Sequence, residues 1–223
     1  VQIQTKSTID TKTIKVLNPK EVVFEGGREL ELDAVSEVPR YYVYNAYGVQ
    51  GIYSAPGTAV KEAYDASGIV TNDRGITVWL KGSRVSRNQI MAIKEEGVTE
   101  QKNSLAVCLD NILRHAGITR NTEYDLAQGK TAITILSVYM TGVQVLDLSG
   151  CSLDAVLYYV NQDIPVLAIL EGGEAVLVTG FNEFNVVIME PSTGRLYKKG
   201  MNDATTWFAE NGNHFITYMN TEN

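Results

Sequence analysis

Two adjacent stretches decide the fold: Gly173-Glu174-Ala175-Val176-Leu177-Val178-Thr179-Gly180-Phe181, and then Asn185-Val186-Val187-Ile188-Met189-Glu190-Pro191-Ser192-Thr193-Gly194. Each is a short apolar run rich in β-branched residues and bounded by glycine or proline, a pattern typical of buried strands. Only three residues separate the two runs, so a tight turn between paired strands is predicted. The first strand begins with a carboxylate, and the second ends in one.

The composition is that of a globular chain with acidic character in one half. The 223 residues carry a net charge of −7. Residues 1–96 hold 12 basic and 12 acidic side chains and residues 97–223 hold 7 and 14, so the whole excess lies in the second half. An acidic half lacks the surplus of basic groups that nucleic acids or anionic lipids require, so we expect neither as a partner. No apolar run reaches the roughly 20 residues of a membrane-spanning helix.

Several features favour a secreted or anchored protein that holds no cofactor. The chain begins at Val1 without an initiator methionine, and we expect an upstream signal or anchor segment and an extracytoplasmic location. The cysteines, Cys108 and Cys151, are too few for a disulfide-built scaffold, and buried free thiols are favoured over a bridge. No phosphate loop, dinucleotide fingerprint or metal-binding spacing occurs, so no cofactor is predicted.

The N-terminal part alternates polar and apolar residues, as half-exposed strands do, at 13–17, 21–25 and 29–33. A tyrosine-dense strand pair follows at 41–53, then a helix from Pro56 to Ala66 and a strand at 76–80. We predict residues 1–96 as one domain, a strand-rich segment followed by a small β-β-α-β module. Polar residues 83–100 mark the boundary.

The second predicted domain spans residues 97–223. Its helices are predicted at 104–116, 152–162 and 203–210, with Ser104, or Asn103 as its rival, capping the first. Its strands are predicted at 133–136, 143–147, 165–170, 174–180, 185–190, 195–198 and 214–219. A leading helix followed by a run of antiparallel strands indicates an α+β fold.

Residues 41–82 resemble a SPOR-type unit of bacterial envelope proteins, in which an aromatic strand precedes an alanine-rich helix. The sheet of that family holds cell-wall glycan, so the resemblance implies that Tyr42, Tyr44, Tyr47 and Trp79 could stack on sugar rings. The alternative is that these aromatics form core and cross-strand pairs, as alternate aromatics in strands commonly do.

Residues 97–220 resemble the papain-like cysteine peptidases that trim leader peptides in bacteriocin export. The resemblance rests on the helix Val107-Cys108-Leu109-Asp110-Asn111-Ile112-Leu113, the segment from Ser152 to Ala168, and the two strands quoted above. That family carries Cys at the helix start, His at the start of the first strand and Asp-Pro after the second. Here Ser104, Glu174 and Glu190 stand at those positions, and Gln101 stands for the glutamine of the oxyanion hole.

These replacements remove the family's chemistry. A cysteine thiolate forms near neutral pH beside a histidine, whereas a serine hydroxyl requires a strong, positioned base. A hydrolase using Ser104, Glu174 and Glu190 remains an alternative. Cys151 is a second candidate nucleophile, because it precedes a helix whose dipole could lower its pKa, and His214 could be its partner.

We therefore expect a papain-like protein without peptidase activity that binds a partner or serves structurally in the bacterial envelope or secreted space. A peptide, a protein or cell-wall glycan is the expected partner. The rival hypotheses are an active hydrolase with an unusual site and a carbohydrate-binding accessory protein.

Overall fold

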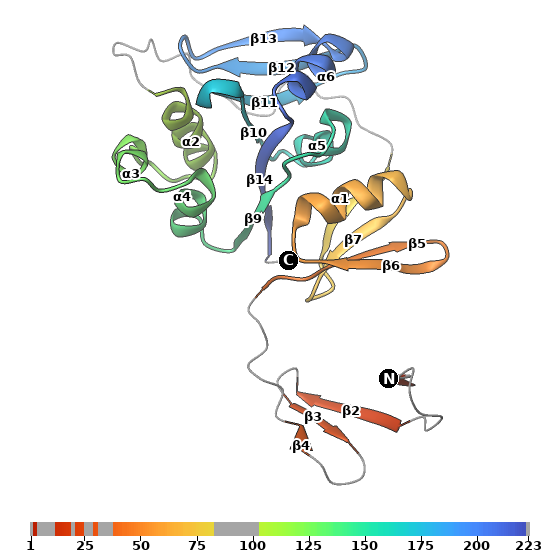
Figure 1. The fold of residues 1–223 in the computed structure, drawn as a ribbon. Helices are drawn as coiled ribbons and strands as arrows, with labels where there is room; N and C mark the ends of the chain where they lie inside the picture. The colour runs from red at the N-terminus through yellow and green to blue at the C-terminus, as the bar shows by residue number, and fades with distance from the viewer. Residues whose placement is uncertain are drawn as a thin grey trace. The chain divides into compact units, whose positions relative to one another are not determined.

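A computed structural model describes residues 38–82 and 103–221 in full, together with the backbone of four short strands before them (Figure 1). The chain divides into two compact units, Val1–Val38 and Pro39–Asn223, here unit 1 and unit 2. Unit 1 holds the antiparallel strands β1 (Gln2–Ile3), β2 (Lys12–Asn18), β3 (Glu21–Phe24) and β4 (Glu29–Leu30), paired in that order. The alternating pattern of the first forty residues therefore forms strands, as predicted.

Unit 2 begins with a four-stranded sheet of order β6-β5-β7-β8. Its elements are β5 (Tyr41–Asn45), β6 (Gly48–Tyr53), α1 (Pro56–Asp65), β7 (Ile69–Asn72) and β8 (Thr77–Leu80). Helix α1 packs on one face of this sheet, where its small side chains Ala59, Val60 and Ala63 are buried. The sequence predicted this module without β7, whose four residues are too short a run to show strand periodicity.

The main part of unit 2 is a six-stranded antiparallel sheet of order β13-β12-β11-β10-β14-β9. The strands are β9 (Val143–Asp147), β10 (Val166–Ile169), β11 (Ala175–Phe181), β12 (Asn185–Glu190), β13 (Arg195–Gly200) and β14 (His214–Asn220). The helices are α2 (Ser104–His115), α3 (Glu123–Ala127), α4 (Ala132–Tyr139), α5 (Leu153–Val160) and α6 (Met201–Glu210). The predicted α+β class is confirmed.

Helices cover both faces of the six-stranded sheet (Figure 1). Helices α2 and α4 lie on one side, and α5 and α6 on the other. Strand β11 is buried at every position, as a central strand covered on both faces must be. Its unbroken apolar run is therefore explained by the helices on either side of it.

One predicted strand is wrong. Residues 133–136 lie inside helix α4, because Thr131 caps its first turn by accepting the Thr134 amide at 3.2 Å. Ala132, Ile135 and Leu136 are buried at helical spacing. The β-branched Ile-Thr-Ile run had suggested a strand, but the tertiary contacts of this segment outweigh that local preference.

The small sheet and the large sheet pack together within unit 2. The indole Nε1 of Trp79 donates to the Ala155 carbonyl at 3.0 Å, and the Tyr159 hydroxyl donates to the Val78 carbonyl at 3.0 Å. The Gln144 amide donates to the Tyr41 hydroxyl at 2.9 Å. The predicted boundary at residues 83–100 lies outside the described residues. Within the described helices, none has the length and apolar character needed to cross a bilayer.

Candidate functional site

The start of α2 is held by two side chains with different partners. Asn103 is the N-cap, and its side chain accepts the Leu105 amide at 2.9 Å. Ser104 is the first residue of the helix rather than its cap, which corrects the first of the two sequence-based alternatives. The Ser104 Oγ instead accepts the Ala175 amide at 3.0 Å and so joins α2 to the start of β11.

The three positions that the sequence singled out at the starts and ends of these elements lie close together in the structure. Glu174 immediately precedes Ala175, and Glu190 ends β12, the next strand of the sheet. All three residues, Ser104, Glu174 and Glu190, line one hollow of about 540 Å³. The rest of its lining comes from Asn103, the turn at Gly172 and Gly173, the first residues of β11, and Pro191 and Ser192 after β12. We call this the first hollow.

The carboxylates of the first hollow are open to a ligand. Glu174 is exposed and Glu190 is half-buried, with its Oε1 accepting the Ser192 amide at 3.1 Å. Arg195 lies directly across from Glu190 in the β12–β13 register. Among the described residues no ion pair involves either carboxylate.

The hydrogen bonds of the first hollow differ from those of a nucleophile and its base. A serine nucleophile needs its hydroxyl bonded to a base. Within the described part of the chain, the hydrogen bond at Ser104 comes from a backbone amide, and neither Glu174 nor Glu190 is bonded to its hydroxyl. The arrangement offers negative charge and a hydroxyl to a ligand.

The cysteines are buried and free, as predicted. The candidate role of Cys151 as a nucleophile is wrong, because burial, with a smaller contribution from Asp147, raises the pKa of its thiol to about 12. Its Sγ donates to the Gly57 carbonyl at 3.3 Å, in the contact between α1 and the segment before α5. Burial likewise raises the pKa of Cys108, which packs in the core.

The predicted aromatic surface is only partly present. Trp79 is 2% exposed and its ring packs between Tyr64 and Tyr158, so it cannot stack on a ligand. Tyr42 and Tyr44 are partly exposed, with ring centroids 6.5 Å apart in a stacked arrangement. Tyr47 is 94% exposed at the β5–β6 turn.

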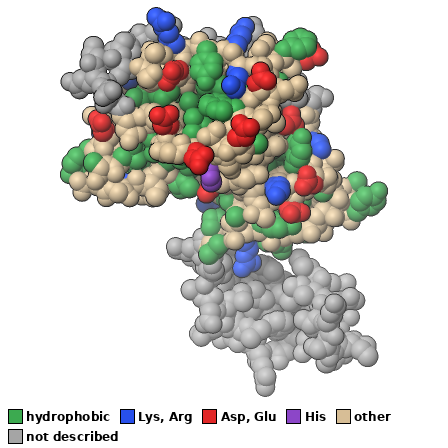
Figure 2. Space-filling view, turned by 45° about the horizontal axis from the view of Figure 1, so that its top comes forward, with side chains coloured by type: hydrophobic (Ala, Val, Ile, Leu, Met, Phe, Trp, Pro, Cys, Tyr) green, Lys and Arg blue, Asp and Glu red, His purple; other side chains and the backbone are tan. Residues whose placement is uncertain are grey.

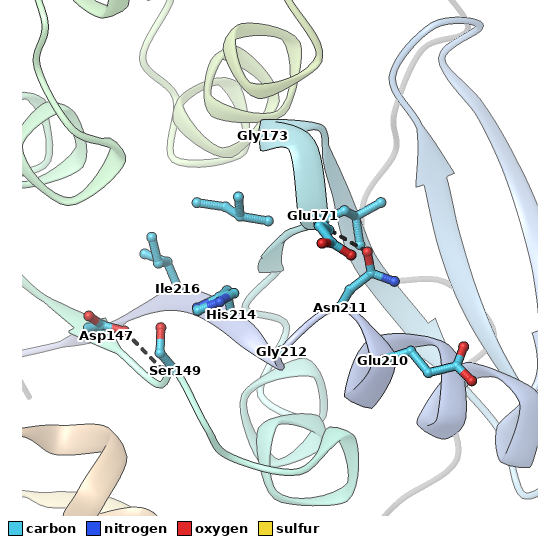
Figure 3. A pocket seen from close by; sticks show the side chains of 11 residues that line it. Asp147, Ser149, Glu171, Gly173, Glu210, Asn211, Gly212, His214 and Ile216 are labelled. Atoms are coloured by element: carbon cyan, nitrogen blue, oxygen red, sulfur yellow. Dashed lines mark hydrogen bonds between the residues drawn. The ribbon is translucent and has the colours of Figure 1, made fainter.

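A second hollow, which the sequence did not predict, adjoins the first at Gly173 (Figure 3). It measures about 590 Å³, and its polar lining includes Asp147, Glu171, Glu210 and His214. The adjacent glycines 172 and 173, both with positive φ, were the available signal of a special turn.

Gln101 lies outside the described residues. No group of described His, Cys, Asp or Glu side chains is arranged to hold a metal ion.

Comparisons with known proteins give limited results. No family model matches the sequence, and no curated protein matches it. Among solved structures, the crystal structure of a Bacillus anthracis protein described as a C39-like peptidase is similar, with a TM-score of 0.49 and 13% identity. The match covers 61% of this chain and all of that one.

Proposed function

We propose that unit 2 is a binding domain that takes a peptide segment bearing basic groups in the first hollow and does not hydrolyse it. The observation that carries the proposal is the meeting of Ser104, Glu174 and Glu190 in one hollow whose carboxylates pair with no described cation. A concave site with a few polar groups is the usual place for a ligand. Its negative charge favours amines and guanidinium groups over anions.

The absence of hydrolysis in this proposal follows from the residues at the family positions. Neither serine nor glutamate supplies the thiolate and imidazole on which the resembling peptidases depend. The Ser104 hydroxyl accepts a hydrogen bond from the Ala175 amide, which supports a positioning role for this side chain. The partner in this proposal is a peptide or protein outside the cytoplasm, in the bacterial envelope or secreted space.

The binding test is a titration of the 223-residue chain with an acetylated, amidated lysine dipeptide, followed by amide shifts. We expect shifts at Ser104 and Ala175, and an affinity about fivefold weaker in the double variant Glu174→Gln, Glu190→Gln. A dipeptide of glutamate is the matched anionic probe. Equal binding of the two dipeptides, or shifts that avoid both residues, would contradict the proposal.

The activity test is incubation with a broad peptide library at neutral pH. We expect no cleavage products by mass spectrometry. Ser137→Ala is the control, because Ser137 is an exposed serine on α4. Turnover that is abolished by Ser104→Ala and retained in Ser137→Ala would contradict this part of the proposal and favour a hydrolase that uses Ser104, Glu174 and Glu190.

Carbohydrate binding through the small sheet is a second candidate. The stacked pair Tyr42 and Tyr44, together with the exposed Tyr47, favours it. Soluble cell-wall glycan fragments that bind wild type and Tyr47→Ala equally well would weigh against it.

A further inference from the structure

Ionisable side chains line one end of the six-stranded sheet. Glu190 ends β12, Glu174 precedes β11, Glu171 follows β10, His214 begins β14 and Asp147 ends β9. These five strands are consecutive in the sheet, and the register places Ile169 opposite both Ala175 and His214. Because neighbouring strands are antiparallel, these alternating starts and ends meet at the same end of the sheet. The result is a row of four carboxylates and one histidine across five strands.

The row runs through both hollows. Glu174 and Glu190 line the first hollow, whereas Asp147, Glu171 and His214 line the second, with Glu210 from the end of α6. Figure 2 shows acidic side chains recurring across one face of unit 2, with a histidine among them. In the described part of the chain no ion pair neutralises any of these five carboxylates.

The second hollow combines this charge with an apolar surface. Ile169, Leu170 and Ile216 contribute to its lining. A lysine side chain matches such a surface, because its methylene stem packs on apolar groups while its ammonium group remains near carboxylates. The described carboxylates are not grouped to hold a metal ion, which directs the inference to an organic cation.

The turn between the two hollows consists of glycine residues. Gly173 lines both, and Gly172 and Gly173 have φ of 86° and 85°. A Cβ atom added to either residue would meet no other atom within 4 Å, so both α-carbons face open space. Backbone without side chains allows another chain to pass close across the turn.

We propose that the two hollows form one groove for an extended peptide with two basic side chains, one held in each hollow, while its backbone crosses Gly172 and Gly173. This inference rests on the proposed function of the first hollow and adds a second subsite to it. The ligand class is thereby a dibasic peptide segment rather than a single amine.

His214 lies in the second hollow among carboxylates. Its ring lies beside Gly212, where an added Cβ atom would approach its Nε2 to 2.8 Å, and Figure 3 shows it between Asp147 and Glu171. The ionisable groups around it are Asp147 of β9, Glu171 of η1 (Glu171–Gly173) and Glu210 of α6. Asp154 of α5, which also packs on β14, accepts the Tyr64 hydroxyl.

The experiment compares peptides with one lysine and with two lysines separated by spacers of about two to six residues, each extended residue spanning about 3.3–3.6 Å. The 223-residue chain is titrated by calorimetry. Glu174→Gln, Glu190→Gln removes both carboxylates of the first hollow, and Glu171→Gln, Glu210→Gln removes two of the three carboxylates of the second. Glu62→Gln, Glu183→Gln is the matched control, because both residues are exposed and line neither hollow.

For the best two-lysine peptide we expect each hollow variant to weaken binding about fivefold and the control to change it less than about twofold. Melting temperatures equal to wild type confirm that the variants are folded.

The outcomes separate the two proposals. An effect of the first-hollow variant alone overturns the second subsite and leaves the proposed function intact. An effect of the second-hollow variant alone overturns the proposed function, while the second hollow stands as a cation site. No gain from the second lysine at any spacing overturns the continuous groove.

Discussion

Ser104 is the first residue of α2, and the resemblance predicts that the peptidases would carry a thiol at this position. The helix N-terminus would stabilise a negative charge there, but a serine hydroxyl is not ionised near neutral pH. The amide of Ala175 uses the same oxygen as an acceptor at 3.0 Å. The Ser104 side chain therefore links α2 to β11.

The position itself can be tested by restoring a thiol. In the double variant Ser104→Cys, Glu174→His, we expect the new thiol to react with iodoacetamide with a pKa below the roughly 8.5 of free cysteine, because the helix N-terminus and an imidazolium both favour the thiolate. The pH dependence of alkylation measures it. The single variant Ser104→Cys is the control, and it should give a higher pKa because Glu174 disfavours a second negative charge.

The native thiols supply a separate prediction. Burial raises the pKa of Cys151 to about 12, and Cys108 is equally inaccessible. We expect the folded wild-type chain to show no alkylation at pH 8 and rapid alkylation in denaturant, as mass spectrometry can report. Rapid labelling of Cys151 in the folded chain would contradict its buried place against α1.

Among the elements, α3 and α4 are joined by one buried carboxylate. Asp125 of α3 accepts hydrogen bonds from Lys130 and from the Tyr139 hydroxyl of α4, the latter at 2.8 Å. These bonds favour the charged form, so the pKa of Asp125 lies below its ordinary value, with the Lys130 bond the largest cause. A group of this kind stabilises the fold while it is ionised.

The contribution of Asp125 to the stability of the fold depends on pH. Because the folded pKa of Asp125 is lowered, its contribution is complete above about pH 4, the unfolded value, and is lost as pH falls through the folded pKa. We expect Asp125→Asn to destabilise the chain at pH 7, and the difference from wild type to shrink in acid. Urea unfolding from about pH 7 to pH 2 measures it, with Glu123→Gln on the same helix as control. A difference that does not vary with pH would refute this role.

On the scale of the whole molecule, Trp79 holds the small sheet against α5 of the larger part. Its indole is buried and donates to the Ala155 carbonyl, while its ring contacts Tyr64 and Tyr158. The aromatic residue that the sequence suggested for sugar binding therefore lies in the internal contact of unit 2.

We expect Trp79→Ala to lower the free energy of unfolding by about 3–5 kcal/mol, the usual cost of removing a large buried aromatic side chain. Tyr47→Ala, at a position 94% exposed, should change it by less than about 0.5 kcal/mol. Urea unfolding of both variants is the measurement. A small effect of Trp79→Ala would mean that the two sheets are not stabilised through this contact.

The sequence by itself determined the features that depend on neighbours along the chain. The apolar runs of β11 and β12, the Ser152 cap of α5 and the helix after Pro56 all follow from local pattern and capping chemistry. Together with the resemblance, it also located the first hollow, because Ser104, Glu174 and Glu190 each stand at the end of an element that could be predicted.

Only the tertiary structure decided what depends on contacts between distant segments. Residues 133–136 became helical, and Cys151 and Trp79 became buried, through packing that no local window contains. The row from Glu190 to Asp147 exists because strand order places β14 between β10 and β9, although His214 lies far from both in sequence. Strand pairing is set by the burial of whole faces, and for that reason the second hollow could not be predicted from the residues that line it.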